Sequence, residues 1–380
     1  MATAIDVHGF AGAFALGVVQ TGFDLKAKRE GPGGFGVEQM EGNRHLLGDF
    51  EVQVDEPRNW EPHQADLVFG NPPCSGFSGL SVSIALRDGS RGDWRKASDI
   101  NHCMADLVNY AAKCNATTVI FESVQMAYSR GLEYMRLLRR ALEEQTGFNY
   151  SLTHVLQNDL SLGGYSMRKR YFWVASRVEF GVEVPELDYV NNLYDAIGDL
   201  EAVPLGGLEG HATLGSQRSK RLAWLAEQVQ WLPGEKSGTA FDKLTEPPPE
   251  GPWWTSRGTL HRTDSRTSLY APRRLDYEKP APVITGYGLD ELFHPRLPRT
   301  LTHREVARIM GYPDEWLCEP FMRKQSWSNR WGKQIPVTAG RWIATNVMAS
   351  MNGNPGSIIG EEIGDRERVI DVTAHWKTAA

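Results

Sequence analysis

The residue with the greatest capacity for chemistry is Cys74, which stands in the segment Asp66-Leu-Val-Phe-Gly-Asn-Pro-Pro-Cys-Ser-Gly-Phe-Ser78. The apolar start predicts a strand over Asp66–Phe69, and the prolines that follow stiffen a turn at the carboxyl end of that strand. Open α/β sheets bind ligands at this edge. A deprotonated thiol there can attack an electron-poor ring carbon. The local sequence equally allows Cys74 to be a small buried residue of a proline-bounded loop.

Residues 73–78 resemble the hallmark of the cytosine-C5 DNA methyltransferases, Pro-Cys-x-x-Phe-Ser, and stand here as Pro-Cys-Ser-Gly-Phe-Ser. Five further blocks resemble this family and occur in the family's order, so the resemblance covers the chain except its irregular middle. These blocks span residues 6–13, 121–124, 164–172, 299–316 and 332–337. The resemblance implies a divergent, S-adenosylmethionine-dependent member that acts on double-stranded DNA.

The resemblance also implies a mechanism and the residues that perform it. Cys74 would add to C6 of a cytosine that has left the duplex. Glu122, directly after an expected buried strand, would bond N3 and the exocyclic amine, and Arg170 would contact O2. Arg168 would lie near the Glu122 carboxylate, on the same face as Arg170, because the two arginines are two apart at a strand start. C5 then becomes nucleophilic and takes the methyl group from the sulfonium.

The first block places a glycine turn between a strand and a helix, which lets the backbone approach a cofactor. It is degraded here, because His8 replaces the usual Phe and Phe10 a usual Gly. Glu30, at the end of the next expected strand, would accept hydrogen bonds from ribose hydroxyls, although an exposed surface acid is an equal interpretation. Asp55 is a weaker candidate for the adenine edge. The predicted cofactor contacts are Asp6, His8, Gly9, Phe10, Gly12, Glu30, Asp55, Asn71, Pro73 and Lys333.

Four blocks depart from the family pattern, at Phe10, Ser123, Ser166 and Lys333. Lys333 stands for the family's Asn near the transferable group, where its charge is unfavourable beside a sulfonium unless an anion compensates. Ser75, on the other flank, is smaller than the Gln often found there. Together they allow an alternative donor, carboxy-S-adenosylmethionine, which would leave a carboxymethyl group on C5. The other interpretation is that Lys333 points outward or pairs with an acid.

Local charge bears on the partner, because the net charge of −6 argues mildly against DNA binding. The run from residue 257 to residue 274 is rich in arginine, with Ser, Thr and Tyr interleaved, which suits phosphate and base-edge contacts. We expect this run to lie along the DNA, unless it is a solvated loop with incidental arginines. Residues 79–95 would form a mobile loop that closes over DNA. The predicted DNA contacts are Ser78, Arg91, Arg257, Arg262, Arg266, Arg273 and Arg274.

The elements that position these residues alternate between strands and helices over residues 1–177, which predicts a Rossmann-like α/β methyltransferase domain with a mostly parallel twisted sheet. Residues 178–280, where periodicity weakens, predict a smaller, irregular target-recognition domain. Residues 281–355 return to the catalytic domain, and residues 356–380 form a polar tail. Strands are expected at Thr3–His8, Asp24–Arg29, Asp66–Phe69, Thr117–Glu122, Tyr150–Leu156 and Arg170–Ala175, and helices at Ala13–Gln20, Ser98–Cys114, Leu132–Glu144, Thr302–Gly311 and Val337–Met351.

The bulk composition fits a globular enzyme. The 380 residues include four cysteines and no C-x-x-C pair, which argues against a zinc knuckle and against a disulfide scaffold. No stretch approaches the ~18 apolar residues of a membrane span, and the N-terminus lacks the pattern of a secretory signal. We therefore expect a monomeric cytoplasmic enzyme, encoded by a bacterium or a phage, without a metal site.

Two other functions stay open at this point. The same scaffold could methylate cytosine in RNA, or the chain could be a DNA-binding relative that has lost catalysis. The arginine-rich recognition domain favours DNA over RNA, and the presence of Cys74, Glu122 and Arg170 favours an enzyme. Trapping on 5-fluorocytosine DNA or RNA separates the three readings, because only an active nucleophile forms a stable adduct that Cys74→Ala removes.

Overall fold

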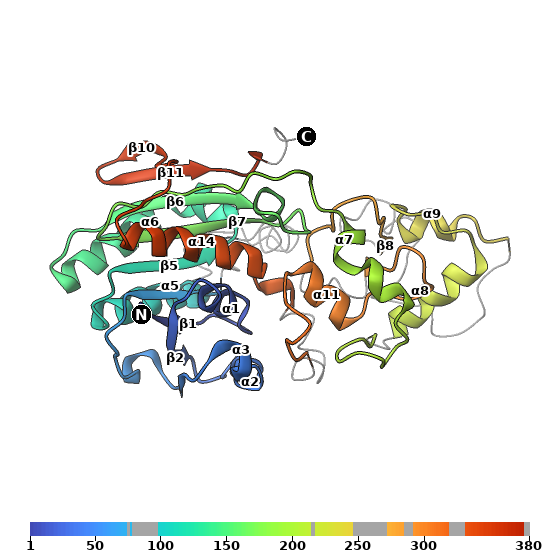
Figure 1. The fold of residues 1–380 in the computed structure, drawn as a ribbon, viewed down its shortest axis with the longest axis horizontal. Coiled ribbons are helices and arrows are strands. Elements are labelled where there is room, and N and C mark those ends of the chain that lie inside the picture. Colours follow the sequence, from blue (N-terminus) through green and yellow to red (C-terminus); the bar gives the residue numbers. More distant parts are fainter. Residues whose placement is uncertain are drawn as a thin grey trace. The chain divides into compact units, whose positions relative to one another are not determined.

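The chain divides into two compact units in a computed structural model that describes residues 1–73, 77, 98–213, 217–245, 272–284, 292–318 and 331–375 (Figure 1). Unit 1 comprises residues 1–164, 168–190 and 334–380, and unit 2 comprises residues 165–167 and 191–333. The sequence predicted boundaries at 177/178 and 280/281. Apart from residues 165–167, unit 2 begins later, at residue 191, and it also keeps residues 281–333, because the helix expected at 302–311 packs within this unit.

Within the described residues, a nine-stranded sheet forms the centre of unit 1, in the order β10-β11-β6-β7-β5-β4-β1-β2-β3. The strands β1 to β5 are mutually parallel, β7 is antiparallel to both of its neighbours, and β11 is parallel to β6. This confirms the predicted class. The strands are β1 (Thr3–Val7), β2 (Asp24–Glu30), β3 (Glu51–Val54), β4 (Leu67–Gly70), β5 (Thr118–Ser123), β6 (Ser151–Asn158), β7 (Lys169–Ser176), β10 (Glu361–Gly364) and β11 (Glu367–Asp371).

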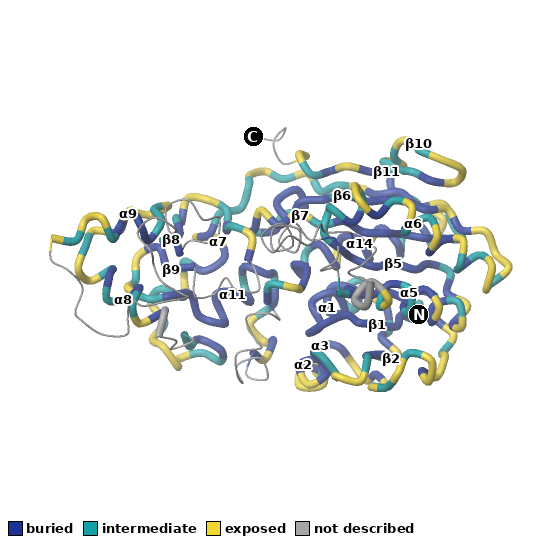
Figure 2. The backbone as a smooth tube through the Cα atoms, turned by 180° about the vertical axis from the view of Figure 1, so that it is seen from behind, coloured by how far each residue is buried: buried dark blue, intermediate teal, exposed yellow. Residues whose placement is uncertain are grey.

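Helices cover both faces of this sheet, and the central strands are therefore buried along their whole length (Figure 2). Val68 packs into the core that α5 and α6 share. Its neighbour Phe69 points to the opposite face, where its ring lies 4.9 Å from the ring of Phe14 on α1. The helices and short turns of unit 1 are α1 (Ala13–Val19), α2 (Val37–Gly42), α3 (Arg44–Leu47), η1 (Pro57–Asn59), α5 (Ser98–Lys113), α6 (Gln125–Thr146), η3 (Asp159–Leu162) and α14 (Val337–Met351).

Helix α14, near the end of the chain, packs against α1, near its beginning. The two backbones approach closely where Gly17 meets Gly340. A Cβ atom at Gly17 would lie 2.4 Å from the backbone nitrogen of Arg341 and 2.6 Å from the carbonyl carbon of Gly340. Glycine is therefore required at this crossing. The bounds of α14 agree with those predicted from the sequence.

The expectation of a polar tail over residues 356–380 is wrong for residues 361–371, which form β10 and β11 at the edge of the sheet. β11 pairs with β6 over its whole length. Glu367 is buried at the start of β11, where it bonds His154 Nε2 at 2.8 Å and Arg136 Nε at 2.8 Å. Glu367 is one of the charged residues that suggested a solvated tail, yet its carboxylate pairs with two side chains inside the protein.

Unit 2 is smaller than unit 1, and its described helices and strands are short apart from α8. Its described core is formed by apolar side chains from α8, α9, β9 and the segment between the two helices: Leu222, Leu225, Trp231, Ala240 and Phe293. None of the helices in the described part of the chain combines the length and the apolar character needed to cross a membrane. The elements are α7 (Leu193–Ile197), η4 (Gly198–Ala202), α8 (Gln217–Gln228), α9 (Ser237–Phe241), β8 (Arg273–Arg274), β9 (Leu292–Phe293) and α11 (His303–Ile309).

Helix α11 begins with a capping box at Thr302. The Thr302 hydroxyl accepts from the Glu305 backbone, and the Glu305 carboxylate accepts from the Thr302 backbone. Arg304 is fully buried and donates to the carbonyls of Glu209, at 3.0 Å, and of Trp316, at 2.8 Å. The block at residues 299–316 therefore has a structural role within unit 2.

Candidate active site

Four predicted site residues converge at one edge of the sheet in unit 1. The strand order places β2, β1, β4 and β5 side by side and parallel, so their carboxyl ends meet at the same edge. Asp6 lies near the end of β1, Glu30 ends β2, Asn71 follows β4, and Glu122 lies near the end of β5. All four side chains are buried, so each requires a partner within the protein or a ligand.

Glu122 has a partner at each carboxylate oxygen. Arg170 Nε lies 2.5 Å from Oε1, and the Asn71 amide donates to Oε2. Burial raises the pKa of Glu122 above its ordinary value, and the nearby charges of Arg170 and Arg168 offset this only in part. A carboxyl group with a raised pKa keeps or shares a proton at higher pH. Such a group suits the bonding of a ring nitrogen.

The antiparallel strand β7 explains why Arg170 reaches Glu122. Because β7 runs against β5, the first residues of β7 lie beside the last residues of β5, and Glu122 is opposite Phe172. Arg168, which is 1% exposed, precedes β7 and acts on Glu122 through its charge. The resemblance assigned Arg168 to the carboxylate and Arg170 to cytosine O2. In the structure the ion pair with Glu122 is made by Arg170.

Asn71 has a role that the sequence did not predict. It was expected to contact the cofactor, but its amide nitrogen is bonded to Glu122. The neighbouring Ser123, which replaces the family's Asn, has a buried hydroxyl with no hydrogen-bond partner among the described residues. An amide directly after β4 can reach the end of β5 because the two strands are adjacent. The adjacency of β4 and β5 is the feature from which the contact between Asn71 and Glu122 could have been predicted.

Several predicted residues lie outside the described residues, namely Cys74, Ser78, Arg91, Arg257, Arg262 and Arg266. The described residues nearest to Cys74 along the chain are Pro73 and Phe77. Phe77 is fully buried and packs into the core of unit 1, where a Cβ atom at Gly131 would lie 2.6 Å from its ring. Pro73 is half-buried. The chain is thus anchored in the core three residues after the predicted nucleophile.

The cofactor side of the edge contains a buried network of charged and polar groups. Lys28 Nζ lies 3.1 Å from Asp6 and 3.0 Å from Glu30, and His8 Nδ1 lies 2.8 Å from Glu30. Burial alone would raise the pKa of Glu30, but Lys28 and His8 lower it to about 2. Burial also raises the pKa of Asp6, which Lys28 offsets only in part. Lys28 was missed because the run Leu-Lys-Ala-Lys-Arg-Glu looks exposed.

The backbone of the first block follows the glycine turn that the sequence predicted. His8, Phe10 and Gly12 have φ values of 55°, 50° and 98°, in the left-handed region that favours glycine. Phe10 stands where the family usually has Gly. A phenylalanine in this left-handed conformation carries local backbone strain. Gly9 is needed for another reason, since a Cβ atom there would lie 2.0 Å from an Asp6 carboxylate oxygen.

The last block closes on the first through a residue that was not singled out. Gln334 is buried, and its side-chain oxygen accepts a hydrogen bond from the backbone of Ala13 at 3.1 Å. Lys333, the predicted contact, is exposed. Asp55 is half-exposed, and its Oδ1 accepts from the Glu56 backbone at 2.7 Å and from Asn59 at 3.0 Å. In the structure the Asp55 carboxylate therefore stabilises a local turn.

Comparison with known proteins decides the family. A family model described as C-5 cytosine-specific DNA methylase matches residues 3–349. The chain belongs to this family. It is accordingly a DNA cytosine-5 methyltransferase that uses S-adenosylmethionine.

A relative and two solved structures resemble this chain over most of its length. Type II methyltransferase M1.HphI of Haemophilus parahaemolyticus is 22% identical over 360 residues, which cover 93% of this chain and 88% of that protein. A prophage-encoded E. coli protein described as a DNA modification methyltransferase superposes with a TM-score of 0.57 at 17% identity, over 93% of this chain and 100% of its own. A DNMT2 mutant of Spodoptera frugiperda gives 0.55 at 12% identity, over 92% and 100%. These likenesses show the fold.

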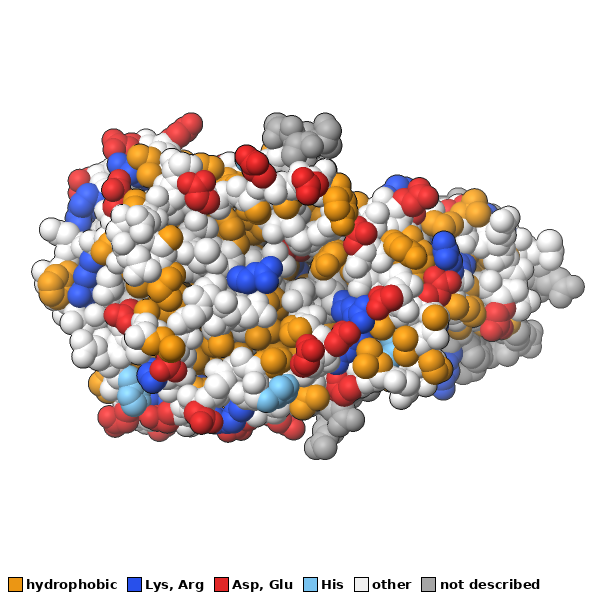
Figure 3. All heavy atoms as spheres, in the orientation of Figure 1, with side chains coloured by type: hydrophobic (Ala, Val, Ile, Leu, Met, Phe, Trp, Pro, Cys, Tyr) orange, Lys and Arg blue, Asp and Glu red, His pale blue; other side chains and the backbone are white. Residues whose placement is uncertain are grey.

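The described basic residues of this methyltransferase give little support to the predicted DNA contacts. Arg274 donates to the carbonyls of Pro295 at 2.7 Å, Trp231 at 3.1 Å and Arg296 at 2.5 Å. All three guanidinium nitrogens therefore serve the fold of unit 2, and the prediction that Arg274 contacts DNA loses its basis. Arg273 is half-buried in the same short strand. On the face shown in Figure 3, basic side chains are scattered among acidic ones.

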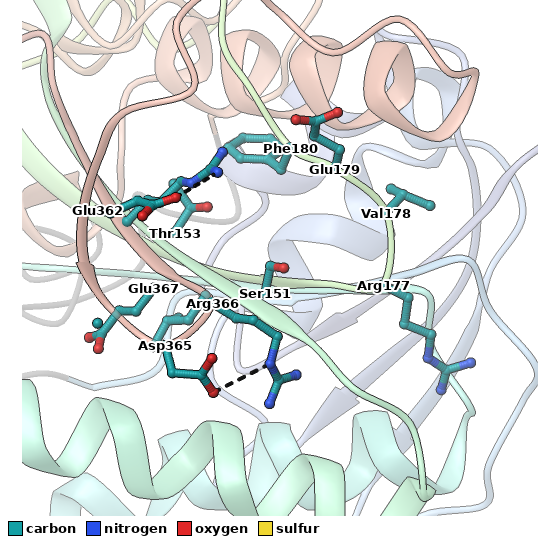
Figure 4. Close-up of a pocket in the computed structure, with 13 residues that line it drawn as sticks. Ser151, Thr153, Arg177, Val178, Glu179, Phe180, Glu362, Asp365, Arg366 and Glu367 are labelled. Atoms are coloured by element: carbon teal, nitrogen blue, oxygen red, sulfur yellow. Dashed lines mark hydrogen bonds and ion pairs between the residues drawn. The ribbon is translucent and has the colours of Figure 1, made fainter.

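A hollow of about 520 Å³ lies elsewhere on the methyltransferase unit (Figure 4). It is lined by Ser151 at the start of β6, by Arg177 just after β7 and by the β10–β11 hairpin, including Asp365 and Arg366. These positions are at the edge opposite to the carboxyl ends of β1, β4 and β5. The hollow is therefore separate from the predicted catalytic residues.

Proposed function

We propose that this enzyme transfers a methyl group to C5 of a cytosine that has flipped out of double-stranded DNA, through a covalent bond between Cys74 and C6. The observation that carries the proposal is the buried Glu122 carboxyl group, with its raised pKa and with Asn71 and Arg170 on its two oxygens. An acid held in this way can recognise N3 and the amine of one pyrimidine. Its position at the ligand-binding edge of the sheet supports this role.

In the proposed reaction the Cys74 thiolate forms a bond to C6, and electron density moves through the ring toward N3. Glu122 donates a hydrogen bond or its proton at N3, and Arg170 stabilises the negative charge that develops. C5 then forms a bond to the methyl carbon while the bond between that carbon and the donor sulfur breaks, the electron pair stays on the sulfur, and any proton held at N3 returns to Glu122. A base removes the C5 proton, and the electrons of that C–H bond restore the double bond and expel Cys74 as a thiolate. The nucleophile is thus regenerated.

The residues present fit S-adenosylmethionine, which supplies an electrophilic methyl group. Asp6 Oδ2 is buried and has no hydrogen-bond partner among the described residues, so it can accept from the ammonium group of the cofactor. Glu30 is ionised at neutral pH, with its pKa near 2. Its carboxylate accepts from His8, Lys28 and the Gly31 backbone. Of about four lone-pair sites on a carboxylate, one remains, which is enough for one ribose hydroxyl.

We propose methyl rather than carboxymethyl as the transferred group. The carboxymethyl alternative rests on a lysine charge beside the transferable group, and Lys333 is exposed whereas the adjacent Gln334 is buried. Mass spectrometry of nucleosides from DNA treated in the presence of either donor tests the choice. We expect 5-methylcytosine only. Detection of 5-carboxymethylcytosine with the carboxylated donor would overturn it.

We propose DNA as the substrate, with the enzyme acting as a monomer. The relatives described above include a type II methyltransferase, and the sequence has three further arginines, Arg257, Arg262 and Arg266, whose side chains suit phosphate contacts.

The test is covalent trapping on 5-fluorocytosine substrates, in which the C5 proton that must leave is replaced by fluorine. We expect a stable adduct with duplex DNA in the presence of cofactor, and none with RNA of the same sequence. Cys74→Ala should abolish the adduct, whereas the control Cys114→Ser should retain it. Glu122→Gln should slow its formation by about 10²–10⁴-fold, the usual contribution of a general acid. An adduct that persists in Cys74→Ala, or that forms on RNA alone, contradicts the proposal.

A further inference from the structure

A buried glutamine with no role in the reaction described so far lies beside Arg170 at the catalytic edge of the sheet. Gln157 is the last residue but one of β6, and it is directly opposite Arg170 in the antiparallel pairing of β6 with β7. Both β5 and β6 are antiparallel to β7. The carboxyl end of β6 therefore lies at the same edge as the carboxyl end of β5, where Glu122 lies.

The side chains of Gln157, Arg170 and Glu122 lie on one face of the sheet. Residues directly opposite each other in an antiparallel pair share a face, with Cβ atoms about 4.5–5.5 Å apart. Gln157 is opposite Arg170, and Glu122 is opposite Phe172. Arg170 and Phe172 are two residues apart on β7, so they share a face as well. Arg170 is therefore flanked by Glu122 on one side and by Gln157 on the other.

The amide of Gln157 has no partner in the structure. The side chain is 0% exposed, and neither Oε1 nor Nε2 has a hydrogen-bond partner among the described residues. A buried amide without hydrogen bonds destabilises a fold. The next residue differs, because the Asn158 side chain accepts from the Leu160 backbone at 3.3 Å. The Gln157 amide thus makes no stabilising contact in the free enzyme, which points to a partner that reaches it in another state.

We propose that Gln157 is a positioning residue, which accepts a hydrogen bond from the Arg170 guanidinium when cytosine occupies the site. This role rests on the proposed function, in which Glu122 bonds N3 and the amine of the base. Here Arg170 Nε lies 2.5 Å from Glu122 Oε1. Once the carboxyl group turns to the base, Arg170 has to share that acceptor or leave it. A guanidinium has five N–H donors, so it can bond Gln157 Oε1 and cytosine O2 together.

The test is the single-turnover rate of covalent adduct formation by the full-length enzyme on 5-fluorocytosine duplex DNA with cofactor. Gln157→Met removes the amide but keeps a side chain of similar length. We expect it to slow adduct formation by about 10–100-fold, as a misplaced catalytic group does, with the Kd for DNA unchanged by fluorescence anisotropy. Leu156→Met is the matched control, because Leu156 is adjacent on β6 and packs into the core on the opposite face. It should react at the wild-type rate.

Stability separates a positioning role from a structural one. Because the Gln157 amide loses no hydrogen bond in the free enzyme, Gln157→Met should not lower the unfolding free energy in urea. Gln157→Glu retains an acceptor oxygen and should form the adduct faster than Gln157→Met. In an Arg170→Met background, Gln157→Met should cause no further slowing, since the group that it positions is absent.

The role of Gln157 is overturned if Gln157→Met reacts at the wild-type rate or is less stable than the wild type. It is also overturned if Gln157→Glu is as slow as Gln157→Met, or if the slowing persists in the Arg170→Met background. A wild-type enzyme that forms no adduct contradicts the proposed function and this role with it. An adduct in the wild type that is insensitive to Gln157→Met contradicts the role alone.

Discussion

Lys28 is expected to contribute strongly to the stability of unit 1, because it is the cation between the buried carboxylates of Asp6 and Glu30. Lys28→Met retains an unbranched side chain of similar length but removes the charge. Removing one partner of a buried ion pair costs about 3–5 kcal/mol, because the other charge stays buried without compensation. Lys26 is the matched control. It lies two residues earlier on the same face of β2, is 47% exposed and pairs with Asp24, so Lys26→Met should cost less than about 1 kcal/mol.

The pKa of Glu30 provides a second route to this magnitude. The fall from the ordinary 4.5 to about 2 corresponds to about 3 kcal/mol, at about 1.4 kcal/mol for each pH unit. Lys28 is the larger of the two groups that lower it, and His8 is the other. Lys28 also interacts with Asp6, which adds to the loss. Both routes therefore place the effect of Lys28→Met at about 3–5 kcal/mol.

Urea denaturation at pH 7.5, followed by far-UV circular dichroism, measures these changes. Adding Asp6→Asn to Lys28→Met should recover part of the loss, because one uncompensated charge disappears. The reasoning is refuted if Lys28→Met and Lys26→Met destabilise equally. It is also refuted if Asp6→Asn worsens the Lys28→Met variant.

Three further outcomes are expected. Gly17→Ala should lower the unfolding free energy by about 1–3 kcal/mol, since its Cβ would meet the α14 backbone at 2.4 Å, whereas Gly33→Ala meets nothing within 4 Å and should be neutral in the same urea assay. Glu122→Gln should lower kcat for DNA methylation by about 10²–10⁴-fold, with binding of S-adenosylmethionine unchanged by calorimetry. Burial lowers the pKa of His294 from 6.5 to about 4, so the neutral imidazole contributes its full stability to unit 2 above pH 6.5, and this contribution is lost as the pH falls through 4. His294→Gln should therefore make the stability of unit 2 less sensitive to acid over this range. An unaltered pH profile would contradict this.

Periodicity predicted most of unit 1. The strands at β1, β2, β4, β5, β6 and β7 and the helices at α1, α5 and α14 lie where apolar spacing placed them, with ends shifted by a few residues at most. Helix α6 begins at Gln125, seven residues before its expected start at Leu132. The capping box at Thr302 can also be recognised in the sequence, because its two hydrogen bonds join residues only three positions apart. Signals of this kind depend only on neighbours along the chain.

The partners of polar side chains could not be predicted in the same way. Lys28 looked exposed because its compensating carboxylates, on β1 and at the end of β2, meet it only after the sheet forms. Arg274 looked free for DNA because a sequence does not reveal backbone carbonyls that lie around a guanidinium. The hairpin β10–β11 was missed because its many charged residues are typical of a solvated segment. Its pairing with β6 at the edge of the sheet cannot be read from the sequence. Each of these depends on contacts between distant segments.

The interrupted course of unit 1 has a consequence for its synthesis. The strand β11 and the helix α14 are translated after residues 191–333 of unit 2, whereas their partners β6 and α1 are translated before unit 2 begins. A nascent chain that ends before Val337 has the predicted catalytic residues but lacks the helix that packs on α1. Since translation proceeds at about 5–20 residues per second, α1 and β6 wait on the order of ten seconds or more for the elements that pack on them.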